Sequence, residues 1–197
     1  MDKDSALLVV DMQNDFCPDG ALAVKEGDLV VPVLNRYIEL FTAQGLPVFF
    51  TRDWHPVETS HFQAFGGVWP VHCVQGTRGA DFHPDLILPP HAVIISKGMD
   101  PSRDDYSALH GAGPDGTPLP VLLRQRGVRK VYVGGLATDY CVKESVLEGI
   151  AQGFTMVYLA DACRGVNLQP EDTGKAEAEM ARAGAGRASL AELTAKG

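Results

Sequence analysis

Five short runs of apolar residues are spaced along the chain. Within each run the apolar residues are continuous rather than alternating, which is typical of strands that are covered on both faces. The runs lie at residues 6–10, 47–51, 92–96, 130–133 and 155–159. We predict a strand at each of them, and a last short strand at residues 187–190.

Amphipathic stretches alternate with these runs. In the first stretch the apolar positions recur with a helical period, and Gly45 can end the helix as a C-cap. Thr138 or Asp139 can cap the start of another stretch, and Gly153 follows its end. The predicted helices are residues 28–44, 119–126, 138–152 and 171–183. Because strands and helices alternate, we expect an α/β fold with three layers, α/β/α, around a mostly parallel central sheet.

Two long segments interrupt this alternation. Residues 52–88 are rich in His, Pro, Gly and aromatic residues, and residues 98–120 are rich in Gly, Pro and Asp. Loops of this length inside a compact domain are usually functional. No linker, internal repeat or low-complexity segment divides the 197 residues, so we predict a single domain over residues 1–197.

The composition is that of an ordinary soluble globular protein, with 45% hydrophobic and 21% charged residues. A formal net charge of -8 argues against nucleic acid or an anionic membrane as a partner, because both require a basic surface. The apolar segment before Asp11 is too short for a signal peptide, and no apolar run approaches the roughly 20 residues of a membrane span. We therefore expect a cytoplasmic protein that acts on a small molecule.

The four cysteines are far apart and form no Cys-x-x-Cys pair. This spacing fits neither a disulfide framework nor a cysteine zinc knuckle. Each cysteine is therefore either a small buried apolar residue or a functional thiol. They are Cys17, Cys73, Cys141 and Cys163.

Three chemically reactive side chains follow predicted strands. Asp11 follows the first run, Lys97 follows the third, and Cys141 follows the fourth after the turn Gly-Gly-Leu-Ala-Thr-Asp-Tyr. In open α/β sheets, ligands bind beyond the carboxyl ends of the strands. We therefore expect the acid, the amine and the thiol to meet at one edge of the sheet.

Cys141 has the most informative position of the four cysteines. It lies near the first turn of a predicted helix, where unpaired N–H groups and the helix dipole favour an anion, and Lys97 would act in the same direction. We expect a thiol that ionises easily, in a turn that directs backbone N–H groups at an oxyanion. A structural interpretation is also open, with Cys141 buried in a helix, Asp11 as a cap and Lys97 as a solvated strand end.

Potential metal ligands are concentrated in the first long loop, at Asp53, His55, His61 and His72. Histidine and aspartate together are the composition of a divalent transition-metal site. The Asp-x-His pair in an extended segment puts two of these side chains on one face, as ligands of one ion require. The alternative is that these are solvated loop histidines.

Four motifs resemble a known family. They are Asp-Met-Gln-Asn-Asp-Phe at 11–16, Thr-Arg-Asp-Trp-His-Pro at 51–56, Trp-Pro-Val-His-Cys-Val at 69–74 and Gly-Leu-Ala-Thr-Asp-Tyr-Cys-Val at 135–142. Together they closely resemble the nicotinamidases, which belong to the isochorismatase-like cysteine hydrolases. The resemblance extends in order from about residue 5 to about residue 165.

The resemblance implies a role for each of these residues. The catalytic triad that it implies is Asp11, Lys97 and Cys141. The metal ligands that it implies are Asp53, His55 and His72, with His61 as a fourth contact. The N–H groups of Ala137 and Cys141 would form the oxyanion hole, next to a cis peptide bond between Leu136 and Ala137. The substrate pocket would contain Phe16, Trp69, Tyr106, Leu136 and Ala137.

The reaction expected from the resemblance is hydrolysis of nicotinamide to nicotinate and ammonia through a thioester on Cys141, in NAD salvage. One divalent metal, either zinc or else iron or manganese, would hold the ring nitrogen. An isochorismatase would need neither Cys141 nor the histidines, and a carbamoyl or ureido amidohydrolase would keep the triad without the metal ligands. A binding or structural protein on the same scaffold is a third alternative. The sequence does not determine the oligomeric state, and a homo-oligomer is compatible with it.

Overall fold

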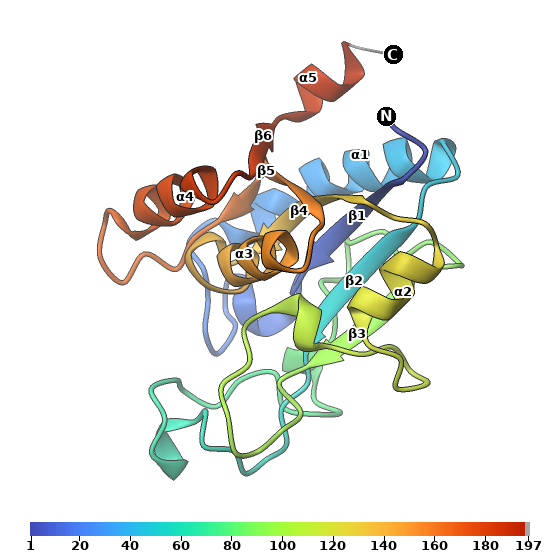
Figure 1. The fold of residues 1–197 in the computed structure, drawn as a ribbon. Helices are drawn as coiled ribbons and strands as arrows, with labels where there is room; N and C mark the ends of the chain where they lie inside the picture. Colours follow the sequence, from blue (N-terminus) through green and yellow to red (C-terminus); the bar gives the residue numbers. More distant parts are fainter. Residues whose placement is uncertain (196–197) are drawn as a thin grey trace.

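A six-stranded parallel sheet forms the centre of the protein in a computed structural model that describes residues 1–195 (Figure 1). The strands lie in the order β3-β2-β1-β4-β5-β6, and every neighbouring pair is parallel. Their bounds are β1 Ser5–Val10, β2 Val48–Asp53, β3 Val93–Lys97, β4 Lys130–Leu136, β5 Thr155–Arg164 and β6 Gly186–Ala188. The predicted α/β fold with a parallel sheet is confirmed.

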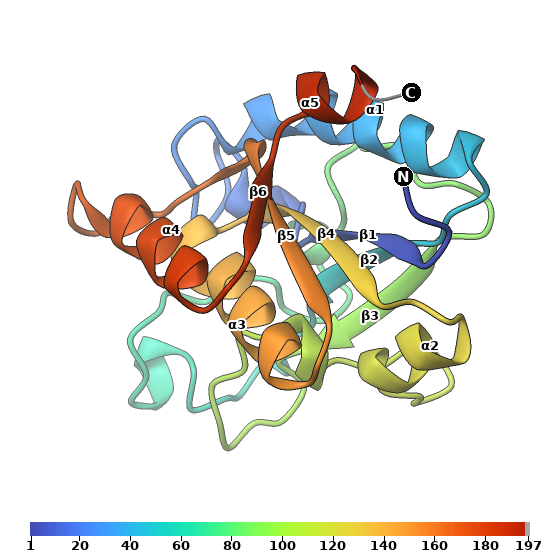
Figure 2. The same cartoon turned by 45° about the horizontal axis from the view of Figure 1, so that its top comes forward.

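Helices cover both faces of the sheet (Figure 2). α1 (Val30–Ala43) and α5 (Leu190–Thr194) lie on one face, and α2 (Leu119–Gln125), α3 (Lys143–Ala151) and α4 (Asp172–Arg182) lie on the other. Each face has its own cluster of buried apolar side chains, so the predicted three layers are present. Within residues 1–195, no helix combines the length and apolar character that crossing a membrane requires.

β1 illustrates why a continuous apolar run becomes a central strand. All six of its residues are buried. Leu7 and Val9 pack in the core that contains the buried side of α1. Leu8 and Val10 pack in the core on the opposite face. Because successive side chains of a strand point to opposite faces, a strand between two helical layers needs apolar residues at every position.

The strand order reverses between β1 and β4. The chain builds outwards from β1 through β2 to β3, and then returns to place β4 on the other side of β1. Such a reversal creates a crevice beyond the carboxyl ends of the two central strands. Gly135 permits their close approach, because its φ is +130° and a Cβ atom there would lie 2.0 Å from the backbone oxygen of Val10.

Two predicted elements differ from those observed. The short strand predicted at residues 187–190 is present as β6 but ends at Ala188, and residues 190–194 form a helix, α5, that was not predicted. Ser189 and Glu192 form a capping box that starts this helix. The helix predicted from residue 138 begins with a π-helical turn, Thr138–Val142, before it continues as α3. Such turns often occur at functional sites, and this one contains Cys141.

Candidate active site

Asp11, Lys97 and Cys141 meet at the carboxyl edge of the sheet. Asp11 follows β1 directly, Lys97 is the last residue of β3, and Cys141 lies in the turn that follows β4. All three side chains are buried. The sequence prediction that these groups converge is therefore correct in space, and the alternative of Lys97 as a solvated strand end is wrong.

The ammonium group of Lys97 is the centre of this cluster. Its Nζ lies 2.9 Å from Asp11 Oδ2, 2.5 Å from Asp53 Oδ1 and 3.4 Å from Cys141 Sγ. An ammonium has three N–H donors, and these three neighbours can accept them. Burial alone would lower the pKa of Lys97, but Asp11 and Asp53 raise it well above its ordinary value. Lys97 therefore stays charged.

Asp11 is held by a threonine of the neighbouring strand. The φ of Asp11 is +48°, a left-handed conformation that ends the extended strand and that aspartate tolerates better than most residues. Thr51 Oγ1, in β2, donates a hydrogen bond of 2.6 Å to Asp11 Oδ1. Burial raises the pKa of Asp11, against the opposing effects of Lys97 and Thr51. Asp11 is therefore a stronger base than an ordinary aspartate.

The Cys141 thiol differs from the sequence expectation. Burial raises its pKa well above the ordinary value, and Asp11 and Asp53 act in the same direction, whereas Lys97 lowers it. The expectation of an easily ionised thiol is wrong for the resting site, because desolvation outweighs the helix N-terminus and the ammonium. A carboxylate oxygen of Asp11 lies within 4.8 Å of the sulfur, so the thiol proton has an acceptor nearby.

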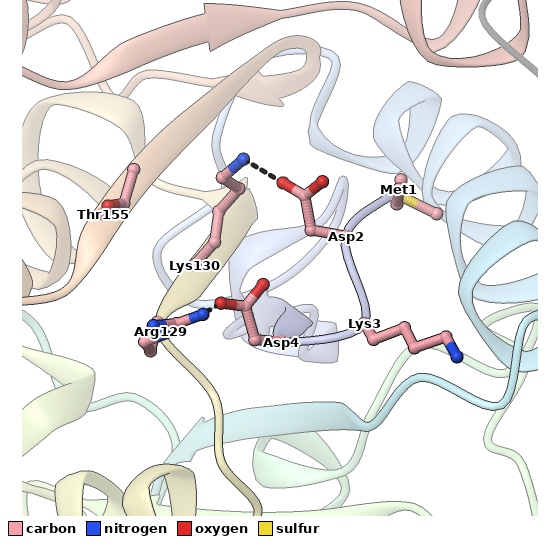
Figure 3. A pocket seen from close by; sticks show the side chains of 7 residues that line it. All are labelled: Met1, Asp2, Lys3, Asp4, Arg129, Lys130 and Thr155. Atoms are coloured by element: carbon pink, nitrogen blue, oxygen red, sulfur yellow. Dashed lines mark hydrogen bonds and ion pairs between the residues drawn. The ribbon is translucent and has the colours of Figure 1, made fainter.

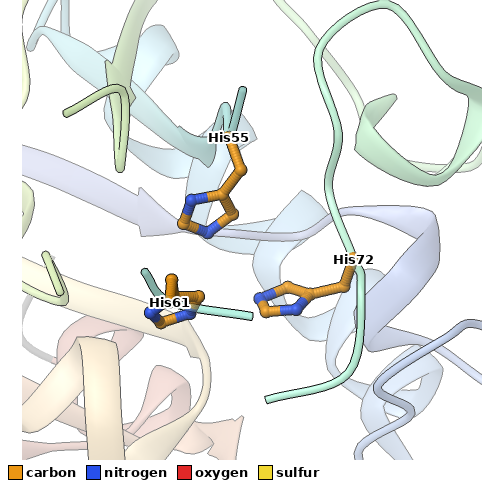
Figure 4. Close-up of side chains that lie close together, drawn as sticks. All are labelled: His55, His61 and His72. Carbon is orange, nitrogen blue, oxygen red and sulfur yellow. The ribbon is translucent and has the colours of Figure 1, made fainter. Parts of the chain in front are cut away.

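Three histidines form a second buried cluster (Figure 4). One ligand nitrogen from each of His55, His61 and His72 lies within 4.8 Å of the others. The Nδ1 atoms are already paired: His55 with Gly98 O at 2.9 Å, His61 with Asp104 Oδ1 at 2.6 Å and His72 with Pro70 O at 2.7 Å. This leaves Nε2 of each ring as the available ligand atom.

The chemistry of this cluster fits a divalent transition metal. His55 Nε2 is buried and has no hydrogen-bond partner among residues 1–195. Burial lowers the pKa of His61, and lowers that of His72 to about 4, so both imidazoles are neutral at pH 7, the form that binds metals. An unpaired buried nitrogen is costly, and a metal ion would satisfy it.

Asp53 connects the two clusters. Its Oδ1 pairs with Lys97, and its Oδ2 lies 3.8 Å from His55 Nε2. Burial would raise the pKa of Asp53, but Lys97 and the nearby histidines hold it well below its ordinary range. Asp53 is therefore a carboxylate that faces the ammonium on one side and the histidine cluster on the other.

A pocket joins Cys141 to the histidine cluster. Its lining residues are Phe16, Leu22, Asp53, His61, Trp69, His72, Tyr106, Ala137, Tyr140, Cys141 and Val166. Four of the five predicted pocket residues line it. The exception is Leu136, which is buried in the core behind the pocket. Leu22, Tyr140 and Val166 line the pocket without having been predicted, and only Tyr140, next to Cys141, had a signal in the sequence.

The pocket walls are mainly aromatic. Trp69 Nε1 donates a hydrogen bond of 2.9 Å to the Tyr106 hydroxyl, and the Trp69 and Tyr140 rings pack edge to face at 5.0 Å. The peptide bond between Leu136 and Ala137 is cis, as the family resemblance implied. Such walls suit a flat aromatic substrate.

A second cavity lies at the opposite, amino end of the sheet (Figure 3). Four of its charged side chains form two ion pairs, Lys130 with Asp2 at 2.5 Å and Arg129 with Asp4 at 2.6 Å. Its lining residues are Met1, Asp2, Lys3, Asp4, Arg129, Lys130 and Thr155. They contain neither a thiol nor a histidine, so this cavity has none of the catalytic groups that line the pocket beside Cys141.

Comparisons with known proteins agree with this assignment. The Isochorismatase domain model matches residues 5–191. The chain is 42% identical over 203 residues to a nicotinamidase of Escherichia coli, covering 95% of each. It is 39% identical over 165 residues to a nicotinamidase/pyrazinamidase of Mycobacterium tuberculosis, covering 82% of this chain and 87% of that one.

The solved structures include the pyrazinamidase of Pyrococcus horikoshii in complex with zinc. Its TM-score to this chain is 0.87 at 44% sequence identity, and the match covers 95% of this chain and 99% of that one. The chain belongs to the isochorismatase family and, within it, to the nicotinamidases.

Proposed function

We propose that this chain hydrolyses nicotinamide to nicotinate and ammonia, as a step of NAD salvage. The observation that carries the proposal is one pocket with aromatic walls that has Cys141 on one side and His61 and His72 on another. Nicotinamide has a matching shape, since it is a flat pyridine ring whose nitrogen and 3-carboxamide point in different directions. The match to the nicotinamidase of Escherichia coli covers 95% of this chain.

The first chemical step joins Cys141 to the substrate. The thiol gives its proton to the Asp11 carboxylate, and the thiolate attacks the carboxamide carbon. The charge that develops on the carbonyl oxygen is stabilised by the N–H groups of Ala137 and Cys141. Lys97 stabilises the thiolate as it forms, because its ammonium lies 3.4 Å from the sulfur.

The second step releases ammonia and the third releases nicotinate. Asp11 returns its proton to the nitrogen as the C–N bond breaks, which leaves a thioester on Cys141. Asp11 then takes a proton from water, and the hydroxide attacks the thioester. The C–S bond breaks, nicotinic acid leaves and loses its proton to solvent to become nicotinate, and the proton on Asp11 restores the thiol.

The histidine cluster would act on the ring nitrogen of the substrate, away from the carboxamide, through a bound metal. A divalent metal held by His55, His61 and His72, with Asp53 beside them, would supply a Lewis-acid contact for the ring nitrogen. Zinc fits these donors, and iron and manganese accept the same set. The role of this site is to orient the ring, so that the carboxamide faces Cys141.

The histidine cluster also separates this proposal from its rivals in the family. The substrate of a carbamoyl or ureido amidohydrolase has no ring nitrogen for a metal to bind. The reaction of an isochorismatase does not need Cys141. Purified protein should release ammonia from nicotinamide, and the release should be lost in Cys141→Ala. Ammonia release from ureido compounds but not from nicotinamide would make the metal-independent amidohydrolase the better assignment.

A further inference from the structure

Two long loops meet above the pocket and are joined by hydrogen bonds at four places, one of which is the bond between His55 Nδ1 and Gly98 O described above. The first loop follows β2 and carries His61 and Trp69; the second follows β3 and carries Asp104 and Tyr106. The backbone N–H of Ser60 donates to Pro101 O at 2.8 Å. Two further bonds link His61 to Asp104 at 2.6 Å and Trp69 to Tyr106 at 2.9 Å. The second loop is thus attached to the metal site at two of its ligands, through a backbone carbonyl at His55 and through a side-chain carboxylate at His61.

His61 is supported differently from the other two histidines. Nδ1 of His55 and of His72 pairs with a backbone carbonyl, whereas Nδ1 of His61 pairs with a side-chain carboxylate from the other loop. The His61 side chain is 4% exposed and that of Asp104 is 49% exposed. The imidazole is therefore buried in the site, while its partner reaches it from the surface.

We propose that Asp104 is a positioning residue that orients His61 toward the metal. This inference rests on the metal site of the proposed function. A carboxylate on Nδ1 fixes that nitrogen as the protonated one, restricts rotation of the ring and makes Nε2 a better ligand. In the proposed reaction Asp104 touches neither the substrate nor Cys141, so it acts through His61 alone.

The contact between Asp104 and His61 also affects the position of Tyr106. It lies two residues after Asp104 and lines the pocket, where its hydroxyl accepts the Trp69 hydrogen bond. When Asp104 holds His61, the segment that carries Tyr106 is also held over the substrate. The Asp104 carboxylate is 49% exposed and its partner is a neutral imidazole, so this hydrogen bond should contribute little to folding, and the main effect expected of Asp104 is on metal affinity.

Zinc affinity, measured by competition with a chromophoric chelator, tests this inference without any activity assay. Asp104→Ala should weaken zinc binding about 10-fold or more, the effect typical of losing such a partner. Asp104→Asn, which keeps an acceptor oxygen, should lose less. The matched control is Asp100→Ala, because Asp100 lies on the same loop, carries the same charge and is 47% exposed, yet bonds to Ser102 instead of a histidine.

A double mutant shows whether Asp104 acts through His61. In a His61→Ala background, Asp104→Ala should cause no further loss of zinc affinity. Equal losses in Asp104→Ala and Asp100→Ala, or full additivity with His61→Ala, would overturn the inference. Thermal unfolding of the metal-free variants should match that of the metal-free parent. A parent protein that binds no zinc would instead refute the metal site of the proposed function, and this inference with it.

Discussion

The two ends of the pocket are built in different ways. At the nucleophile end, Asp11 and Lys97 come from strand ends and Cys141 from the turn after β4, so the sheet itself sets their distances. At the metal end, His61 and His72 come from a long loop, and hydrogen bonds from Nδ1 set the orientation of each ring. One end is fixed by the fold, and the other is fixed by contacts between loops.

This difference predicts different responses to mutation. The reaction needs each group of the nucleophile end, so loss of one group should abolish or strongly reduce turnover while the metal site stays intact. At the metal end several ligands hold one ion, so loss of one ligand should weaken metal binding only in part and leave the thiol in place. The variants below separate the two ends, in order of expected effect.

Cys141→Ala should have the largest effect. Without the nucleophile no thioester can form, and ammonia release from nicotinamide should fall by at least about 1,000-fold. Metal content and thermal stability should stay near those of the parent protein. Cys163→Ala is the control, since Cys163 is also a buried cysteine but lies in β5. Substantial activity in Cys141→Ala would refute the covalent mechanism.

Asp11→Asn should reduce kcat by about 100-fold or more, because an amide cannot accept the proton of a thiol whose pKa is raised by burial. KM should change much less, since Asp11 lies behind the sulfur and not on the pocket wall. Steady-state kinetics with nicotinamide distinguish the two parameters. A near-normal kcat would mean that Asp11 is a structural residue.

His55→Ala should act on the metal end. It removes the ligand with the unpaired buried Nε2, and nicotinamide turnover should fall by about 10- to 100-fold together with metal content. Alkylation of Cys141 by a small haloacetamide, followed by mass spectrometry, should proceed at nearly the parent rate. His91→Ala, on the exposed segment before β3, should leave turnover and metal content unchanged. Loss of thiol reactivity in His55→Ala would contradict the separation of the two ends.

Thr51→Val should have the smallest effect of the four. It removes the hydrogen bond to Asp11 Oδ1, worth about 1.5 kcal/mol for a charged acceptor, and should lower kcat about 10-fold. Thr51→Ser keeps the hydroxyl and should restore most of the rate. Equal losses in both variants would point to a packing effect of the methyl group instead.

The strand framework and its catalytic edge could be predicted from the sequence. Continuous apolar runs mark the buried strands, and parallel strands bring their carboxyl ends together, which places Asp11 near Lys97. Helix α5 was not predicted because it has only five residues, too few for a periodic pattern, although Ser189 and Glu192 carry a capping signal.

The interactions that tune the site could not be predicted. The contact of Thr51 with Asp11 spans 40 residues of sequence, and that of Asp104 with His61 spans 43. No local pattern pairs residues so far apart. The pKa of Cys141 was expected in the wrong direction because it depends on the depth of burial, which position in a helix does not give. Leu136 faces the core for a related reason, since side-chain direction at the end of β4 depends on the turn that follows.

Comparison of nicotinamide with benzamide tests the central claim most directly. The two amides have the same shape, but benzamide lacks the ring nitrogen that the metal end would hold. With zinc-loaded protein we expect benzamide to be hydrolysed at least about 100-fold less efficiently than nicotinamide, and chelation to remove most of this preference. Equal hydrolysis of both amides, or full nicotinamide turnover in metal-free protein, would contradict an orienting role for the metal end.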